Sequence, residues 1–281
     1  MLTGMVDNHG SEAPAGGVTL RLDWSDEPGQ RPPRTPETAQ EALAILDNGS
    51  RGFANLADHP VELRLAPESL GFGPDETGGI LTQEPFAAVL GCSDARVPIE
   101  LALGQAANEL FVVRVAGNAP SSACRGSLRY AAEYLPSVRL VAVMGHSRCG
   151  ATSAAVDATL DPAKYLTIAT DGRLREIIDP LFAGVNFAQR ALLEVHGADA
   201  MDSPLFRIRL VTLATLANTA LSALILEHDL GLPCAFGVYK LSARAVGVRR
   251  GDGWHDGFAM APKNGTEIAE LVQDAARSLP L

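Results

Sequence analysis

Three short apolar runs, separated by helical patterns, constrain the fold of this chain more than any other feature. The runs occupy residues 86–90, 110–115 and 140–144. Parallel strands that are joined by helical crossovers are buried on both faces, which explains runs without polar interruption. We therefore predict an α/β fold in which a central, mostly parallel β-sheet is flanked by helices.

The patterns around these runs predict the other elements of the domain. A helix over residues 124–135 should separate the second and third runs, and another should begin near Cys149. A fourth apolar run at residues 234–239 predicts a further strand of the same sheet. It follows a helix-rich insertion that spans about residues 160–230.

The N-terminal part of the chain divides into an arm and a helix. Residues 1–34 are rich in Gly, Pro, Asp and Ser without apolar periodicity, which predicts a flexible arm. Thr35 is a candidate N-cap of an amphipathic helix that should end at Asn48 and Gly49. The predicted organisation is an arm followed by one domain over residues 35–281.

Charge and composition restrict the partners and the compartment. The net charge of −10 argues against nucleic acid and anionic membranes, because both need a basic surface. The first residues lack the features of a secretory signal, so we expect a cytoplasmic protein without disulfides. The longest uncharged stretch, residues 210–226, is interrupted by Thr, Asn and Ser and predicts a buried helix rather than a membrane span.

Two motifs follow the first and third apolar runs directly. Cys92, Asp94 and Arg96 form a Cys-x-Asp-x-Arg motif, and His146 and Cys149 form a His-x-x-Cys motif. The carboxyl ends of parallel strands form the edge of a sheet at which ligands bind. If the two cysteines and the histidine hold one ion, the first and third strands must be neighbours. The strand order is then 2-1-3, plus the further strand.

The residue types in the two motifs indicate zinc. Two thiolates and an imidazole are ligands that Zn²⁺ prefers, and three protein ligands leave a fourth position open for catalysis. In extended backbone Asp94 should stand between Cys92 and Arg96, and His146 and Cys149 should share the first turn of a helix. If Arg96 released Asp94, this carboxylate could become the fourth ligand of a closed site.

Other interpretations of these residues remain open. The zinc could be purely structural, although structural sites usually close all four positions with protein ligands. Cys92 and Cys149 could be buried thiols without a metal, and redox chemistry is disfavoured because neither has a Cys-x-x-Cys partner. We interpret Cys124 and Cys234 as small buried apolar residues.

The two motifs resemble the hallmark motifs of the beta-class carbonic anhydrases. Val115 departs from the asparagine that is usual in the family, and the insertion at 160–230 is longer than expected. The likeness otherwise extends over further positions in order and spacing: Gln105, residues 111–114, 116–118, 126–128 and 145–151, and the late strand at 237–239.

The resemblance implies an activity, a cofactor and an assembly. The activity is reversible hydration of carbon dioxide to bicarbonate and a proton. One Zn²⁺ per chain is implied on Cys92, His146 and Cys149, with zinc-bound hydroxide oriented by Asp94 and Arg96. Gln105 would bind bicarbonate, and the assembly would be a homodimer or a higher even oligomer.

Two other functions remain open at this stage. The same scaffold could hydrolyse carbon disulfide or carbonyl sulfide, which would require a different route of substrate access with the same ligands. Alternatively, the chain could be a non-catalytic module, stabilised by zinc, that senses bicarbonate or binds a partner.

Overall fold

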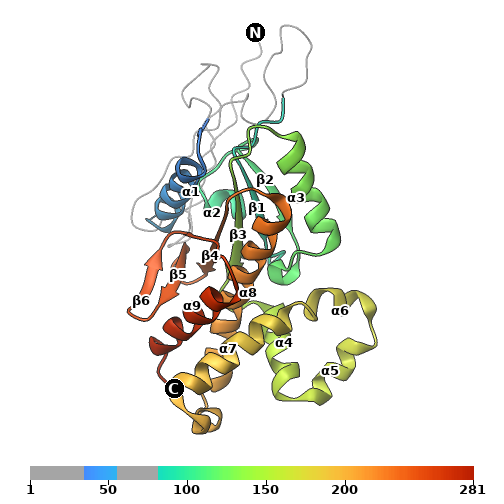
Figure 1. The fold of residues 1–281 in the computed structure, drawn as a ribbon, viewed down its shortest axis with the longest axis vertical. Helices are drawn as coiled ribbons and strands as arrows, with labels where there is room; N and C mark the ends of the chain where they lie inside the picture. The colour runs from blue at the N-terminus through green and yellow to red at the C-terminus, as the bar shows by residue number, and fades with distance from the viewer. Residues whose placement is uncertain (1–34, 56–81) are drawn as a thin grey trace, which may run out of the picture.

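A central β-sheet flanked by helices organises the computed structural model, which describes residues 35–55 and 82–281 (Figure 1). The predicted arm at residues 1–34 lies outside the described residues. Among the described residues the sheet order is β2-β1-β3-β4-β5-β6, and β7 pairs with β4. The strands are β1 (Ala87–Gly91), β2 (Leu110–Arg114), β3 (Leu140–His146), β4 (Cys234–Lys240), β5 (Ala245–Arg250), β6 (Gly253–Asp256) and β7 (Ala259–Met260).

The predicted fold class and strand order are confirmed. β1 pairs in parallel with both β2 and β3, and β3 pairs in parallel with β4. The expected fourth strand is therefore β4, beside β3. An antiparallel extension follows, in which β5 pairs with β4 and β6 with β5.

Helices cover both faces of the sheet. Alternate residues of β1 point to opposite faces, so Ala87 and Val89 pack in one core cluster and Ala88 and Leu90 in the other. The first cluster lies under α1 and α2, and the second lies under α3, α4, α7, α8 and α9. The helices are α1 (Ala39–Ala54), α2 (Ile99–Ala102), α3 (Ser122–Tyr134), α4 (Gly150–Leu160), α5 (Pro162–Ala169), α6 (Gly172–Ile178), α7 (Leu181–His196), α8 (Phe206–Leu230) and α9 (Gly265–Arg277), with short 3₁₀ turns η3 (Ala116–Asn118) and η4 (Ala198–Asp202).

The ends of α1 differ from the sequence prediction. Thr38, not Thr35, is the N-cap, because its hydroxyl accepts from the backbone N–H of Glu41 while the Glu41 carboxylate accepts from the backbone N–H of Thr38. The helix also continues past Asn48 and Gly49 to Ala54. Gly49 is there for close packing rather than termination: a Cβ at this position would overlap the backbone carbonyl of Leu103.

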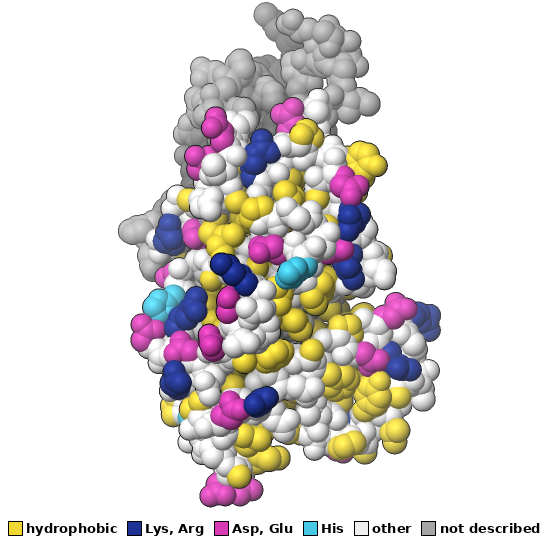
Figure 2. Space-filling view, in the orientation of Figure 1, with side chains coloured by type: hydrophobic (Ala, Val, Ile, Leu, Met, Phe, Trp, Pro, Cys, Tyr) yellow, Lys and Arg dark blue, Asp and Glu magenta, His cyan; other side chains and the backbone are white. Residues whose placement is uncertain are grey.

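Residues 160–230 contain α5, α6, α7, η4 and α8. Figure 1 shows α5 and α6 extending away from the sheet, joined to it through α4. On the face drawn in Figure 2, acidic and basic side chains intermingle, and apolar side chains gather over this lobe. Leu166 and Leu174 are among its exposed apolar residues.

Helix α8 contains the uncharged stretch 210–226. By length and composition it could cross a membrane, but 72% of its apolar window is buried inside the fold. It packs on the sheet beside β3 and β4. The prediction of a buried core helix is therefore confirmed.

Candidate metal centre

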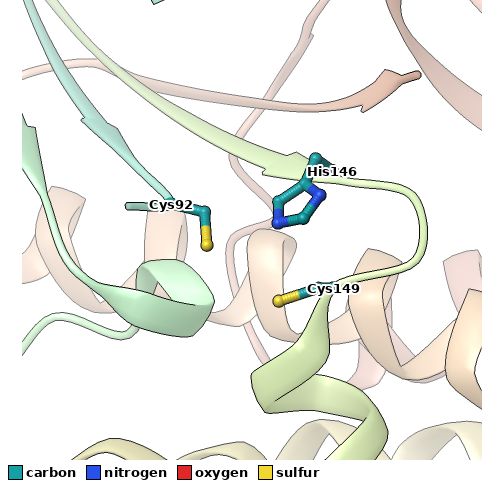
Figure 3. A group of neighbouring side chains, drawn as sticks. All are labelled: Cys92, His146 and Cys149. Atoms are coloured by element: carbon teal, nitrogen blue, oxygen red, sulfur yellow. The ribbon is translucent and has the colours of Figure 1, made fainter. Parts of the chain in front are cut away.

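Cys92, His146 and Cys149 converge at the carboxyl ends of two neighbouring strands (Figure 3). Cys92 follows β1, and His146 is the last residue of β3. Cys149 is the N-cap of α4. The sulfur and ring nitrogen atoms all lie within 4.8 Å of one another, and all three side chains are buried. The adjacency of β1 and β3 brings together two motifs that are far apart in the sequence.

A short turn between β3 and α4 places Cys149. The expectation that His146 and Cys149 share the first turn of a helix is wrong, because His146 ends the strand and the helix begins at Gly150. Arg148 has a positive φ of 59°, which reverses the chain. Ser147 fixes this turn to β4, since its N–H donates to the Tyr239 carbonyl over 2.9 Å.

His146 presents one nitrogen to the cluster. Its Nδ1 lies 3.1 Å from the Ser147 carbonyl oxygen, which can only accept, so Nδ1 carries the proton. In the neutral imidazole this tautomer leaves the lone pair on Nε2. Nε2 is buried and has no hydrogen-bond partner among the described residues. A buried acceptor without a partner is costly, and a metal ion beside it removes that cost.

The two thiols differ in proton affinity. The hydrogen bond with Cys92 lowers the pKa of Cys149 below its usual range, and the backbone N–H of Thr152 acts in the same direction. The hydrogen bond to Cys149, together with burial, raises the pKa of Cys92. A pair of buried thiols in contact suits a divalent cation, which binds thiolates and displaces their protons.

These residues fit zinc. With Zn–S bonds of about 2.3 Å, ligand atoms of a tetrahedral site are about 4 Å apart, a spacing close to that of the cluster. Two sulfurs and one nitrogen are a donor set that favours zinc over hard cations such as magnesium. Cys92, His146 and Cys149 would thus supply three ligands of a tetrahedral centre.

Asp94 lies beside the cluster and is held by Arg96. Arg96 Nε donates to Asp94 Oδ1 over 2.9 Å, and a terminal nitrogen of the guanidinium donates to Oδ2 over 2.7 Å. Asp94 Oδ2 is 3.8 Å from His146 Nε2. The Arg96 guanidinium holds the pKa of Asp94 well below its usual value. The carboxylate is therefore ionised and directed to the edge of the cluster.

The backbone of this motif turns rather than continuing the strand. The Arg96 N–H donates to Asp94 Oδ1 over 2.9 Å, and the Val97 N–H donates to the Asp94 carbonyl over 3.1 Å. The expectation of extended backbone with alternating side chains is wrong here. The carboxylate and guanidinium meet because the aspartate side chain closes its own turn.

The region around these motifs is similar to known proteins. Residues 87–186 match the carbonic anhydrase family. The resemblance to the beta-class carbonic anhydrases is confirmed. Both motifs fall inside the matched residues.

Two curated carbonic anhydrases match the chain over part of their length. Carbonic anhydrase 2 of Mycobacterium tuberculosis is 31% identical over 148 residues, which cover 52% of this chain and 64% of that protein. The carbonic anhydrase of Mycolicibacterium smegmatis is 36% identical over 109 residues, which cover 39% of this chain and 50% of that protein. The chain thus spans less than two thirds of the relatives it matches.

Solved structures of beta-carbonic anhydrases show a weaker likeness. That of CcaA has a TM-score of 0.49 at 20% identity, covering 67% of this chain and 84% of the other. That of CafA from Aspergillus fumigatus has a TM-score of 0.44 at 21% identity, covering 83% and 96%.

Arg114, within the residues that match the carbonic anhydrase family, is a residue whose role the sequence did not reveal. It ends β2, and its Nε donates to the Cys92 carbonyl over 3.0 Å. A terminal nitrogen donates to the Asp94 carbonyl over 2.8 Å. Arg114 therefore fixes the backbone between a thiol and the carboxylate. Its place in the resemblance to the carbonic anhydrases was the only signal that could have identified it.

Gln105 lies against α1 rather than completing the cluster within this chain. Its side chain is buried and its amide donates to the Leu103 carbonyl, close to Gly49. The structure therefore brings five of the six predicted site residues together. A role for Gln105 in binding bicarbonate stays a prediction.

Proposed function

We propose that this protein catalyses the reversible hydration of carbon dioxide to bicarbonate and a proton, as a zinc-dependent lyase. One observation carries the proposal: a buried Cys92, His146 and Cys149 cluster, with an unpartnered His146 Nε2, lies directly beside an ionised Asp94. The match to the carbonic anhydrase family supports the reaction.

Each group of the site has a distinct task in this proposal. Cys92, His146 and Cys149 hold zinc, which supplies a Lewis acid that activates water near neutral pH. Asp94 accepts a hydrogen bond from the attacking water and so directs its lone pair toward carbon dioxide. Arg96 keeps Asp94 anionic and fixed, and Arg114 holds the backbone that carries both Cys92 and Asp94.

The charges of the ligands explain why an accessory carboxylate is useful. Two thiolates cancel the formal charge of Zn²⁺, which makes the metal a weaker acid than one held by neutral histidines. An oriented acceptor compensates by fixing the attacking oxygen in a reactive geometry. Asp94 is therefore essential for turnover but dispensable for holding the metal.

The experiment compares zinc content and stopped-flow hydration of carbon dioxide in the wild type and in Asp94→Ala. We expect the variant to retain zinc and to lose about 100-fold or more in rate, a typical effect of removing a group that acts on the reacting atoms. Asp199→Ala, an exposed aspartate remote in sequence, is the control. Stoichiometric zinc in the wild type with no hydration between about pH 7 and pH 9 would refute the proposal.

The same preparations separate the other functions. Turnover of carbonyl sulfide or carbon disulfide in place of carbon dioxide would indicate a hydrolase. Bicarbonate binding without any turnover would indicate a sensing module.

We further infer a homodimer or a higher even oligomer. Support comes from the family resemblance and from exposed aromatic residues on α3, where Tyr130 and Tyr134 stack with ring centroids 5.3 Å apart. Light scattering coupled to size exclusion gives the mass in solution, and a monomer at micromolar concentration would contradict the inference. The cytoplasmic location stays a prediction.

A further inference from the structure

A stripe of small polar side chains runs along α8 where this helix faces the metal centre. Thr215, Asn218, Thr219 and Ser222 are all buried, although the helix around them is largely apolar. Their spacing places them on one side of the helix. Thr219 lies against Gly145, the residue before His146, where a Cβ would overlap its hydroxyl. The stripe therefore reaches the end of β3 at the metal ligands.

The four polar groups are satisfied in two different ways. The hydroxyls of Thr215 and Thr219 donate to carbonyls one turn back in α8. In contrast, Asn218 and Ser222 reach out of the helix to the η3 turn. Asn218 Nδ2 donates to the Gly117 carbonyl over 2.9 Å, and Ser222 Oγ to the Asn118 carbonyl over 3.5 Å. Asn218 makes the shorter of these two contacts.

The η3 turn has a backbone that needs external support. Gly117 has φ of 73° and Asn118 has φ of 46°, two successive residues in the left-handed region. Asn118 carries a side chain there, which is unfavourable unless surrounding contacts fix the conformation. The hydrogen bonds from α8 supply such contacts.

This conformation aims a backbone donor at a metal ligand. The Gly117 N–H points at Cys92 Sγ, with the nitrogen 3.4 Å from the sulfur. The carbonyl of the same residue is the group that Asn218 holds. Asn218 therefore anchors the residue whose N–H donates to the sulfur, without touching the sulfur itself.

We propose that Asn218 is a positioning residue of the metal centre, which acts through Gly117 on the Cys92 sulfur. This inference rests on the proposed function, because it assumes that Cys92 binds zinc. An N–H that donates to a thiolate stabilises its negative charge and fixes the direction of its lone pairs. Groups in this position commonly change metal affinity 10- to 100-fold.

The test uses Asn218→Leu, whose side chain has the same branching and no donor, with Thr215→Val as the matched control. Thr215 lies on the same face of α8, but its hydroxyl bonds only within the helix. Zinc affinity is measured by competition with a chelator. We expect Asn218→Leu to weaken zinc binding about tenfold and Thr215→Val to leave it within about twofold of wild type.

A spectroscopic readout separates positioning from a general structural role. In the cobalt-substituted protein, the sulfur-to-metal charge-transfer band reports the electron density on the thiolates. Loss of the N–H donor should shift this band to lower energy in Asn218→Leu and leave it unchanged in Thr215→Val. If Asn218→Leu does not fold, Asn218→Ala removes the same donor and is measured in the same way.

The outcomes also separate this inference from the proposed function. A wild-type protein that binds neither zinc nor cobalt would refute the metal centre and the inference with it. A wild type that binds both metals, with the same band and affinity in Asn218→Leu as in Thr215→Val, would refute the inference alone.

Discussion

At the scale of single residues, three side chains of the candidate metal centre are oriented by a neighbour that is not itself a candidate ligand. Ser147 fixes the tautomer of His146, Arg96 fixes Asp94, and Gly117 donates to Cys92. Such contacts preset the direction of each lone pair and reduce the reorganisation needed when a metal binds. The pocket is therefore suited to a metal by these supporting contacts as well as by the identities of the candidate ligands.

Replacing Cys92 with serine tests the assignment of the ligands. We expect Cys92→Ser to lose zinc and carbon dioxide hydration together, because a neutral hydroxyl is a far poorer zinc ligand than a thiolate. Elemental analysis of the purified variant gives the metal content. Cys234→Ser is the control, since Cys234 is a buried thiol at the start of β4. Full zinc occupancy in Cys92→Ser would remove Cys92 from the ligand set.

At the scale of elements, the apolar runs and the two motifs were sufficient to predict the order β2-β1-β3 with a further strand, but not the antiparallel strands β5, β6 and β7. β1 and β3 must be neighbours if their ends share an ion, and they are. The ends of α1 were not predictable in the same way. Thr35 and Thr38 both suit an N-cap, and only contacts with Leu103 distinguish a packing glycine at Gly49 from a terminating one.

Substitutions at two glycines of α1 distinguish the effect of close packing on stability from the effect of helix propensity. A Cβ at Gly49 would overlap the Leu103 carbonyl, whereas a Cβ at Gly52 would meet nothing within 4 Å. We expect Gly49→Ala to destabilise the protein by about 1–3 kcal/mol through overpacking. Gly52→Ala should be neutral or stabilise by up to about 1 kcal/mol. Denaturant unfolding measures both, and equal effects would show that α1 does not pack tightly here.

At the scale of the whole molecule, contacts between distant segments bring supporting residues to the site that the sequence alone does not assign to it. Arg114 reaches from β2 to the backbone near Cys92, and Asn218 reaches from α8 to η3. Neither residue belongs to the Cys-x-Asp-x-Arg or His-x-x-Cys motif, so spacing within those motifs assigns no role to them. The candidate ligands were predictable because two local motifs contain them. The residues that support those ligands were not predictable, because only the folded chain brings them near the site.

An ion pair that joins α4 to α8 predicts how the stability of the protein depends on pH. Arg207 donates to both carboxylate oxygens of Asp157, over 2.6 and 2.8 Å, and lowers the pKa of Asp157. The stabilisation is complete above the unfolded pKa of about 3.9 and is lost as pH falls through the lower native pKa. We expect Asp157→Asn to be less stable than wild type at pH 7 by about 1 kcal/mol or less.

The difference between Asp157→Asn and wild type should narrow below about pH 4, because protonation then removes the ion pair from the wild type as well. Unfolding by denaturant at pH 7 and at about pH 3 checks this. Asp199→Asn gives the baseline for loss of an exposed charge. A difference that stays constant or widens at low pH would contradict the assignment.

The position of the cluster at the ends of β1 and β3 has a kinetic consequence. A metal bound there would tie together two central strands and enclose the whole β2–α3–β3 segment in a loop. Release of the ion would then require the ends of two buried strands to separate, so metal exchange should be coupled to opening of the core. A variant that speeds amide exchange in β1 should therefore also speed zinc loss, and one that slows the first should slow the second.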